Sequence, residues 1–301
     1  MRRLLLTACA LICLVTLPGT ARAAGDLIEK IESPYNTILI FRQPPYVTLA
    51  FGHKTRNYVE SRRNPTDLLE LSVEYTRPMI ASLAYTSDPK KFLMIGMGGG
   101  SISWYVHQQI PDSQVTAIEL DPEIIRLAGK YYRMKEDGRL RIVESDGRVH
   151  LLRDKGPYDV IFVDAYRGPF VPFHLLTKEF FELAKKRLAP GGVIAQNIEP
   201  STMLFDKAQA TILSVFDNID LYPAAGNVVA IAYDGPRKTQ AELDKAAAAL
   251  QEKYRFRYDL RETVKGRQLV PPSVADTEPL TDDFAPVNTL KQIPAHNKKR
   301  Q

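Results

Sequence analysis

The stretch that decides the fold is KFLMIGMGGGSISWYVHQQIPDSQVTAIELDP, residues Lys91 to Pro122. Its apolar run Phe92–Ile95 predicts a buried strand, and a glycine-rich turn and a helical segment follow. A second apolar run, Val115–Leu120, predicts another strand that carries Glu119 near its end. Strand, glycine-rich turn, helix, strand and acid together are typical of one βαβ unit of a nucleotide-binding sheet.

The glycines and the acid of this unit each suit the binding of a nucleoside for a chemical reason. Gly96, Gly98 and Gly100 let the backbone turn tightly and approach a ligand closely. Glu119 follows about 20 residues later, where a carboxylate can accept hydrogen bonds from both hydroxyls of a ribose. A glycine-rich turn alone is a weak signal, because glycine also serves plain turns, but here the strand, the helix and the acid agree. We therefore expect these four residues to bind a nucleoside.

The first 23 residues have the pattern of a secretory signal. Arg2 and Arg3 precede an apolar run from Leu4 to Leu17, and Ala21-Arg22-Ala23 is a small-x-small cleavage site. The run is short for a bilayer span, although an uncleaved anchor is the alternative. We expect a secreted or periplasmic protein that meets a membrane only through this segment, if the segment stays uncleaved.

Charge and cysteine content exclude several classes of function. Cleavage after Ala23 removes three arginines and no acid, which lowers the formal charge of the 301-residue chain from +5 to +2. The remaining basic residues are scattered, so nucleic acid is not an expected partner. Cys9 and Cys13 both lie in the signal, which leaves no thiol for a disulfide, a nucleophile or a metal. Five histidines without metal-ligand spacing give no reason to expect a metal site.

Continuous apolar runs alternate with amphipathic segments through the centre of the chain. This pattern predicts an α/β fold with a mostly parallel seven-stranded sheet and helices on both faces. The last two strands should form a hairpin that reverses one strand at the sheet edge. The expected strands are Phe92–Gly96, Val115–Leu120, Leu140–Val143, Asp159–Asp164, Val193–Ile198, Ile219–Tyr222 and Val228–Tyr233.

The helices and the outer segments complete the predicted organisation. A small antiparallel β element precedes the main domain, a helix over 68–85 leads into it, and an Ala-rich helix over 238–254 follows it. Main-domain helices are expected at Ile102–Gln109, Pro122–Tyr132, Gly147–Arg153, Thr177–Leu188 and Met203–Val215. The expected divisions are 1–23 signal, 24–75 β element, 76–235 nucleotide-binding domain, and 236–301 C-terminal helix and irregular tail.

Ligands of an open parallel sheet lie at the carboxyl ends of its strands, so the residues that end each strand are the candidates for chemistry. Asp146 follows the third strand and suits either an adenine amino group or the N-cap of the next helix. Asp164 ends the fourth strand after four apolar residues, where a carboxylate is costly to desolvate. We predict that it is catalytic, either deprotonating an attacking amine or binding a sulfonium substituent. Tyr166 could wall the same pocket.

Two further polar residues are expected to serve structure. His174 is expected to pack or to cap rather than act as a general base. Asp282 and Asp283 lie in an unusual C-terminal motif that could fold back over the cleft, although a turn with a helix-like cap explains them more simply.

Together these residues resemble the spermidine synthase family, the polyamine aminopropyltransferases, on the class I methyltransferase-like Rossmann fold. The resemblance covers roughly residues 27–233. It rests on the nucleotide turn Gly96-Met-Gly-Gly-Gly, Glu119 as the ribose acid, the adenine-side pair Asp146-Gly147, and Asp164 as the first acid of the catalytic loop.

Three shorter segments add to the resemblance. Glu32–Asn36 is similar to the opening segment of the family, and Leu280–Val287 to the ending of its divergent bacterial members. Tyr75 falls at the conserved helix tyrosine. The resemblance implies Asp164, Tyr166 and Tyr75 as catalytic residues.

The resemblance also implies the reaction. Decarboxylated S-adenosylmethionine or S-adenosylmethionine would be a co-substrate rather than a permanently bound cofactor. The acceptor would be a small-molecule amine, and the family often forms a homodimer through its N-terminal β element.

Three departures from the family pattern leave alternatives open. Gly99 and Arg167 stand where the family has acids, and Thr76 stands where a histidine follows the tyrosine. An arginine beside the pocket suits a carboxylate, such as that of intact S-adenosylmethionine. Aminopropyl transfer is therefore the first hypothesis, methyl transfer the second, and a non-catalytic extracytoplasmic nucleoside- or polyamine-binding module the third. Secretion would also separate the enzyme from decarboxylated S-adenosylmethionine, a cytoplasmic metabolite.

Overall fold

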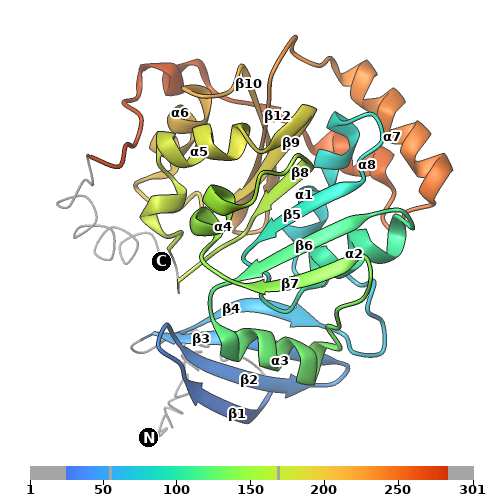
Figure 1. Cartoon of the computed structure of the whole chain (residues 1–301), viewed down its shortest axis with the longest axis vertical. Coiled ribbons are helices and arrows are strands. Elements are labelled where there is room, and N and C mark those ends of the chain that lie inside the picture. Colours follow the sequence, from blue (N-terminus) through green and yellow to red (C-terminus); the bar gives the residue numbers. More distant parts are fainter. Residues whose placement is uncertain (1–24, 54–55, 168–169, 284–301) are drawn as a thin grey trace, which may run out of the picture.

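The computed structural model describes residues 25–53, 56–167 and 170–283. It contains a four-stranded sheet close to the N-terminus and a larger eight-stranded sheet (Figure 1). The expected signal, 1–23, and positions 284–287 of the motif that starts at Leu280 lie outside the described residues. Within the described ranges, no helix combines the length and the apolar composition needed to cross a membrane.

The small N-terminal sheet confirms the predicted antiparallel β element. Its strands follow one another in chain order, and each pairs antiparallel with the next. Ile38, Ile40 and Leu49 are fully buried and share one hydrophobic core with the main domain. The strands are β1 (Asp26–Glu32), β2 (Thr37–Gln43), β3 (Tyr46–His53) and β4 (Arg56–Arg63).

The main sheet is built around the stretch quoted first. Its spatial order is β12-β10-β11-β9-β8-β5-β6-β7, and the five strands from β9 to β7 are parallel. Their carboxyl ends therefore meet at one edge, and Figure 1 shows the N-terminal sheet below that edge. The strands are β5 (Lys91–Ile95), β6 (Gln114–Glu119), β7 (Leu140–Glu144), β8 (Tyr158–Val163), β9 (Leu188–Ile198), β10 (Asn218–Ala224), β11 (Asn227–Tyr233) and β12 (Gln268–Leu269).

The position predicted for the reversed strand was wrong. The hairpin of β10 and β11 forms as expected, but β11 lies inside the sheet, antiparallel to both β9 and β10. Its residues from Val228 to Tyr233 are all buried, as an inner strand requires. A hairpin sequence fixes the pairing of its two strands, but it does not say which of them meets the rest of the sheet. The two-residue strand β12 extends the predicted seven strands to eight.

Helices cover both faces of the main sheet, as predicted. Phe92 and Met94 of β5 face one hydrophobic core, and Leu93 and Ile95 face the other. The first core includes residues of α2 (Ser101–Gln109), α3 (Pro122–Tyr132) and α7 (Gln240–Tyr254). The second includes residues of α4 (Gly147–Arg153), α5 (Lys178–Lys185) and α6 (Phe205–Leu213).

The predicted helix over 68–85 forms only in part. Only its second half is helical, as α1 (Thr76–Met79) and the 3₁₀ segment η1 (Ile80–Tyr85). In the non-helical first half, the backbone N–H and C=O of Leu71 form hydrogen bonds with side chains instead of with a helix. The Leu71 amide donates to the Tyr258 hydroxyl at 3.0 Å, and the Leu71 carbonyl accepts from Arg77 Nε at 3.1 Å. Tyr258 is 187 positions away in the chain, so local sequence gives no sign of this contact.

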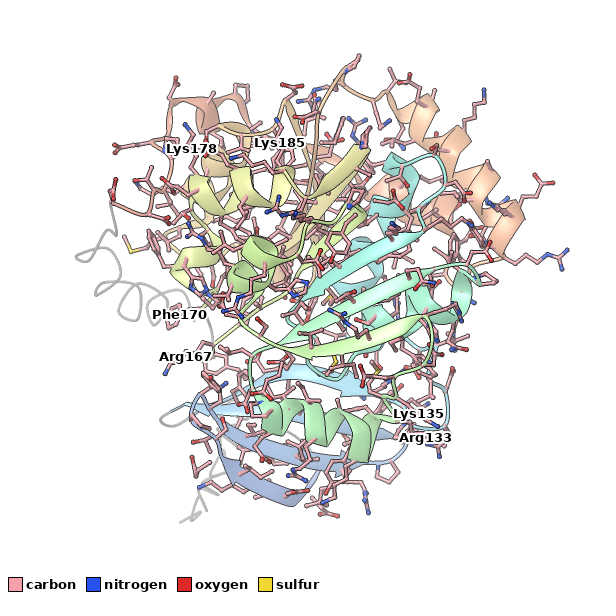
Figure 2. The ribbon with its side chains drawn as sticks, in the orientation of Figure 1. Arg133, Lys135, Arg167, Phe170, Lys178 and Lys185 are labelled. Carbon is pink, nitrogen blue, oxygen red and sulfur yellow. The ribbon has the colours of Figure 1, made fainter. Side chains whose placement is uncertain are left out.

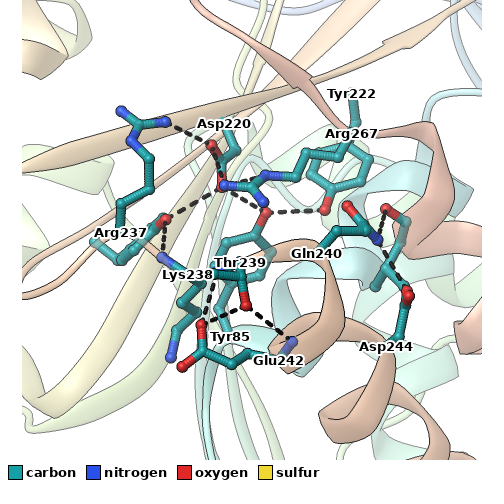
Figure 3. Close-up of polar contacts among 12 residues, drawn as sticks. Tyr85, Asp220, Tyr222, Arg237, Lys238, Thr239, Gln240, Glu242, Asp244 and Arg267 are labelled. Carbon is teal, nitrogen blue, oxygen red and sulfur yellow. Dashed lines mark hydrogen bonds and ion pairs between the residues drawn. The ribbon is translucent and has the colours of Figure 1, made fainter.

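The region after α7 contains short elements that pack against the sheet. Arg267 donates to Asp220 at 3.0 Å, and Asp220 on β10 is completely buried (Figure 3). Tyr85 also donates to Asp220, at 2.9 Å. This network ties the C-terminal region to the main sheet. The remaining elements are η2 (Phe173–Leu175), α8 (Leu260–Thr263), η3 (Val264–Gly266) and η4 (Pro272–Asp276).

Candidate active site

The glycine-rich turn after β5 needs glycine for steric reasons. Gly96 has φ +85°, and a Cβ there would lie 2.3 Å from the carbonyl oxygen of Asp164. Gly100 has φ +76°, and its Cβ would lie 2.4 Å from the sulfur of Met134. Gly98 has φ +53°, and among the described residues a Cβ there would meet only the Ser61 Cβ, at 3.9 Å, so this position needs glycine for its backbone conformation and not for space. The turn thus lets the end of β8, where Asp164 lies, come into direct contact with the end of β5.

Glu119 connects this turn to the end of β6. One carboxylate oxygen accepts the Gly98 N–H at 3.0 Å, and the other accepts the backbone N–H groups of Leu120 and Asp121 at 2.9 and 3.1 Å. Burial raises the pKa of Glu119, although these three N–H groups oppose that rise. The carboxylate is fixed in orientation and keeps lone pairs for a ligand in the adjoining cavity.

Asp146 caps a helix, as one of the two interpretations predicted. Its Oδ1 accepts the Val149 N–H at 3.0 Å at the start of α4, and its Oδ2 lies 2.8 Å from His174 Nε2. The contact with His174 lowers the pKa of Asp146. Asp146 also lines the cavity, so capping leaves a ligand contact available. The next residue must be glycine, because a Cβ on Gly147 would lie 2.2 Å from Ile95 Cγ2.

Asp164 follows β8 and is held from two sides. The Tyr75 hydroxyl donates to Oδ2 at 2.9 Å, and the Asn197 side-chain amide donates to Oδ1 at 2.9 Å. Burial raises the pKa of Asp164 to about 6, and the bonds from Asn197 and Tyr75 limit that rise. A carboxylate with this pKa is mostly ionised at neutral pH and can still accept a proton.

The side chains around Asp164 form a polar network that continues onto β11. The Asn197 side-chain oxygen accepts from Asn227 at 3.0 Å, and the Asn197 carbonyl accepts from the Tyr166 hydroxyl at 3.2 Å. Burial, followed by the charge of Asp164, raises the pKa of both Tyr75 and Tyr166. The two tyrosines are therefore neutral hydrogen-bond donors. Asn197 and Asn227 were not predicted as site residues. For Asn197 a signal was available, because it is a polar residue inside the otherwise mostly apolar run Val193–Ile198.

One cavity of about 440 Å³ brings the predicted site residues together. Its wall includes Tyr75, Gly96, Gly98, Glu119, Asp146, Gly147, Asp164 and Tyr166. Gly100 is not part of that wall, because it packs against Met134 behind the turn. The N-terminal sheet closes the cavity with side chains that the sequence did not single out for the site, Leu49, Phe51 and Glu60, next to Tyr35 and Asn36.

Gly99 and Arg167, the two departures from the family pattern, have different surroundings. A Cβ on Gly99 would point at Ser61, 2.4 Å from its hydroxyl oxygen, so that position is directed at the N-terminal sheet. The Gly99 carbonyl accepts from the buried guanidinium of Arg63 at 3.2 Å. Arg167 is exposed and lines the cavity, and Figure 2 places it with Phe170 at the border between the two sheets.

Asp282 has a role that neither interpretation predicted. It is not in the cavity wall, and it forms a bidentate ion pair with Arg148 of α4. Its backbone N–H donates to Glu179 at 3.0 Å. Within the described residues, no group of His, Cys, Asp and Glu is arranged to hold a metal ion.

These observations define a class: a Rossmann-like α/β protein whose strand ends form an acid-rich, nucleoside-sized cavity. A family model described as the spermine/spermidine synthase domain matches residues 74–225. The polyamine aminopropyltransferase of Chromobacterium violaceum is 33% identical over 69% of this chain and 80% of its own length. The polyamine aminopropyltransferase of Vibrio vulnificus is 29% identical over 94% of this chain and 97% of its own length. The chain belongs to the spermine/spermidine synthase family.

Solved structures support the fold. The spermidine synthase from Thermotoga maritima superposes with a TM-score of 0.64 at 22% identity, over 83% of this chain and 86% of the other. Human methyltransferase-like protein 13 in complex with SAH superposes with a TM-score of 0.56 at 25% identity, over 60% of this chain and 92% of the other. The methyltransferase-like Rossmann fold predicted from the sequence is confirmed.

Proposed function

We propose that the protein transfers an aminopropyl group from decarboxylated S-adenosylmethionine to an amine of a polyamine. The observation that carries this proposal is the carboxylate of Asp164, which Tyr75 and Asn197 orient at the end of a nucleoside-sized cavity. Membership of the spermine/spermidine synthase family supports the reaction type. Fold alone would not decide it, because methyltransferases share the fold.

The donor fits the residues of the cavity wall. Both oxygens of Glu119 act as acceptors toward backbone N–H groups, and acceptor oxygens suit the two hydroxyls of a ribose. Asp146 keeps acceptor capacity for an adenine amino group beside its capping bond. The backbone at Gly96 and Gly98 leaves room for the nucleoside, because neither residue has a side chain. The donor is a co-substrate that leaves after each turnover.

In the reaction, the acceptor nitrogen attacks the methylene carbon next to the sulfonium. The new N–C bond forms as the C–S bond breaks, and the bonding pair returns to sulfur, so that neutral methylthioadenosine leaves. Asp164 takes the proton that the attacking nitrogen loses. The sulfonium is already a good leaving group, so most of the acceleration comes from holding the two reactants in line.

Methyl transfer is the second candidate, because Arg167 lines the cavity and could pair with the carboxylate of intact S-adenosylmethionine. If so, Arg167→Asp should weaken binding of the intact donor. An unchanged donor preference in that variant would remove the basis for this candidate.

The experiment that separates the two reactions identifies the nucleoside product. The purified chain is incubated with a diamine and each donor in turn. Aminopropyl transfer predicts methylthioadenosine from the decarboxylated donor and no turnover of the intact one. S-adenosylhomocysteine from the intact donor would instead establish methyl transfer.

We also propose that the protein is exported, on the evidence of the signal pattern in residues 1–23. Mass spectrometry of the protein from a periplasmic extract should give an N-terminus at Ala24. A full-length chain found only in the cytoplasm would contradict export.

A homodimer is a separate proposal, supported by the exposed apolar residues Leu27 and Val59 on the N-terminal sheet. Light scattering on the purified chain should give twice the chain mass, and a monomer mass would contradict it.

A further inference from the structure

Glu60 enters the cavity through an irregularity in the N-terminal sheet. Along the pairing of β3 with β4, Leu49 lies opposite Ser61 and Ala50 lies opposite Val59, which leaves Glu60 as an extra residue. An extra residue of this kind is a β-bulge, and bulges turn a side chain out of its regular direction. Ser61 is buried and Val59 is 51% exposed, while Glu60 lines the cavity.

The carboxylate of Glu60 differs from the other acids at this site. Glu119 accepts three backbone N–H groups, and Asp164 accepts bonds from Tyr75 and Asn197. Within the part of the chain that the structure describes, Glu60 accepts no hydrogen bond and forms no ion pair. Burial raises its pKa, and the negative charges of Asp164 and Glu119 add to the effect. An ionised carboxylate in this position lacks a cation.

Glu60 shares the cavity wall with two carboxylates for which roles are proposed above. Its two charged neighbours are Glu119, on the ribose side, and Asp164, on the reacting side. A donor with its ribose at Glu119 and its reacting carbon near Asp164 would place the sulfonium substituents in this cavity, which Glu60 also lines. Arg167 is the one arginine or lysine in the described wall of this cavity. Its side chain is exposed, so solvent screens its charge.

We propose that Glu60 binds the ammonium group at the end of the donor's three-carbon chain and thereby selects the decarboxylated donor. This inference rests on the proposed function. The intact donor carries a carboxylate on the same carbon as its ammonium group, and Glu60 would repel that carboxylate. Glu60 is then a specificity-determining residue, and the bulge in β4 places its side chain in the cavity wall.

The test is calorimetric titration of the purified chain with each of the two donors. Glu60→Gln should weaken binding of the decarboxylated donor by about 10- to 100-fold, the range for losing a hydrogen bond to a charged group. It should leave binding of the intact donor unchanged or tighter, so that the preference collapses. Glu74→Gln is the matched control, because Glu74 is exposed and outside the cavity wall, and it should keep the wild-type preference.

The outcomes separate this inference from the proposed function. A Glu60→Gln variant with the wild-type preference would overturn the inference and leave the proposed function intact. A wild-type chain that prefers the intact donor would overturn both. Glu60→Gln should unfold at the same temperature as wild type or higher, because it replaces a carboxyl group that has no hydrogen-bond partner among the described residues and is costly to ionise in the cavity wall. Should this variant not fold, Glu60→Ala is titrated in the same way and must lose the preference.

Discussion

The Tyr75 hydroxyl donates a 2.9 Å hydrogen bond to Asp164 Oδ2, and this bond joins the start of α1 to the end of β8. It stabilises the ionised carboxylate, and it therefore lowers the pKa of Asp164 against the larger, opposite effect of burial. Together with the bond from Asn197, the hydroxyl therefore extends to lower pH the range in which Asp164 is ionised and can accept a proton.

The first prediction follows from that bond. Activity requires ionised Asp164, so the rate should fall as the pH drops below about 6, the pKa of Asp164. Tyr75→Phe removes a stabilising donor, raises this pKa, and should move the acidic limb of the kcat/KM profile up by about one pH unit. Tyr46→Phe is the control, because the Tyr46 hydroxyl bonds to Glu70 outside the cavity wall. Identical profiles for Tyr75→Phe and wild type would refute the assignment.

The second prediction concerns the glycine-rich turn. Gly96→Ala places a Cβ 2.3 Å from the Asp164 carbonyl oxygen and should abolish donor binding by forcing β5 and β8 apart. Gly191 has a similar φ, +74°, but a Cβ there meets nothing within 4 Å. Gly191→Ala therefore pays only the backbone strain, about 1–2 kcal/mol, and should bind donor like wild type. If both variants bind donor equally well, the close approach at Gly96 is not needed.

The third prediction concerns the buried network of Figure 3. Asp220 accepts bonds from Tyr85, Arg237 and Arg267. Asp220→Asn should lower the free energy of unfolding by about 3–5 kcal/mol, because it leaves the Arg267 guanidinium buried without a counter-charge. Asp88→Asn removes an exposed partner of Lys253 and should cost about 1 kcal/mol or less. Urea denaturation measures both, and equal losses would show that the network is not a stabilising centre.

Residues at strand ends could be predicted from the sequence, because local pattern determines them. Glu119 and Asp164 each follow an apolar run, and the parallel sheet brings such ends to one edge. Glu60 could not be found in this way, since it depends on a bulge and on how two sheets face each other. The turn before Thr76 depends on Tyr258, from the far end of the chain. Gly100 fits the nucleotide-binding pattern, yet it serves packing against Met134.

The most direct test of the central claim is the effect of Asp164→Asn on turnover and on donor binding, measured with one protein preparation. Release of methylthioadenosine from decarboxylated S-adenosylmethionine and a diamine gives kcat, and calorimetry gives the donor Kd. Loss of a positioned general base predicts a kcat lower by about 10²- to 10⁴-fold, with the donor Kd nearly unchanged. A variant that keeps wild-type kcat would contradict the assignment of Asp164 as the residue that activates the acceptor amine.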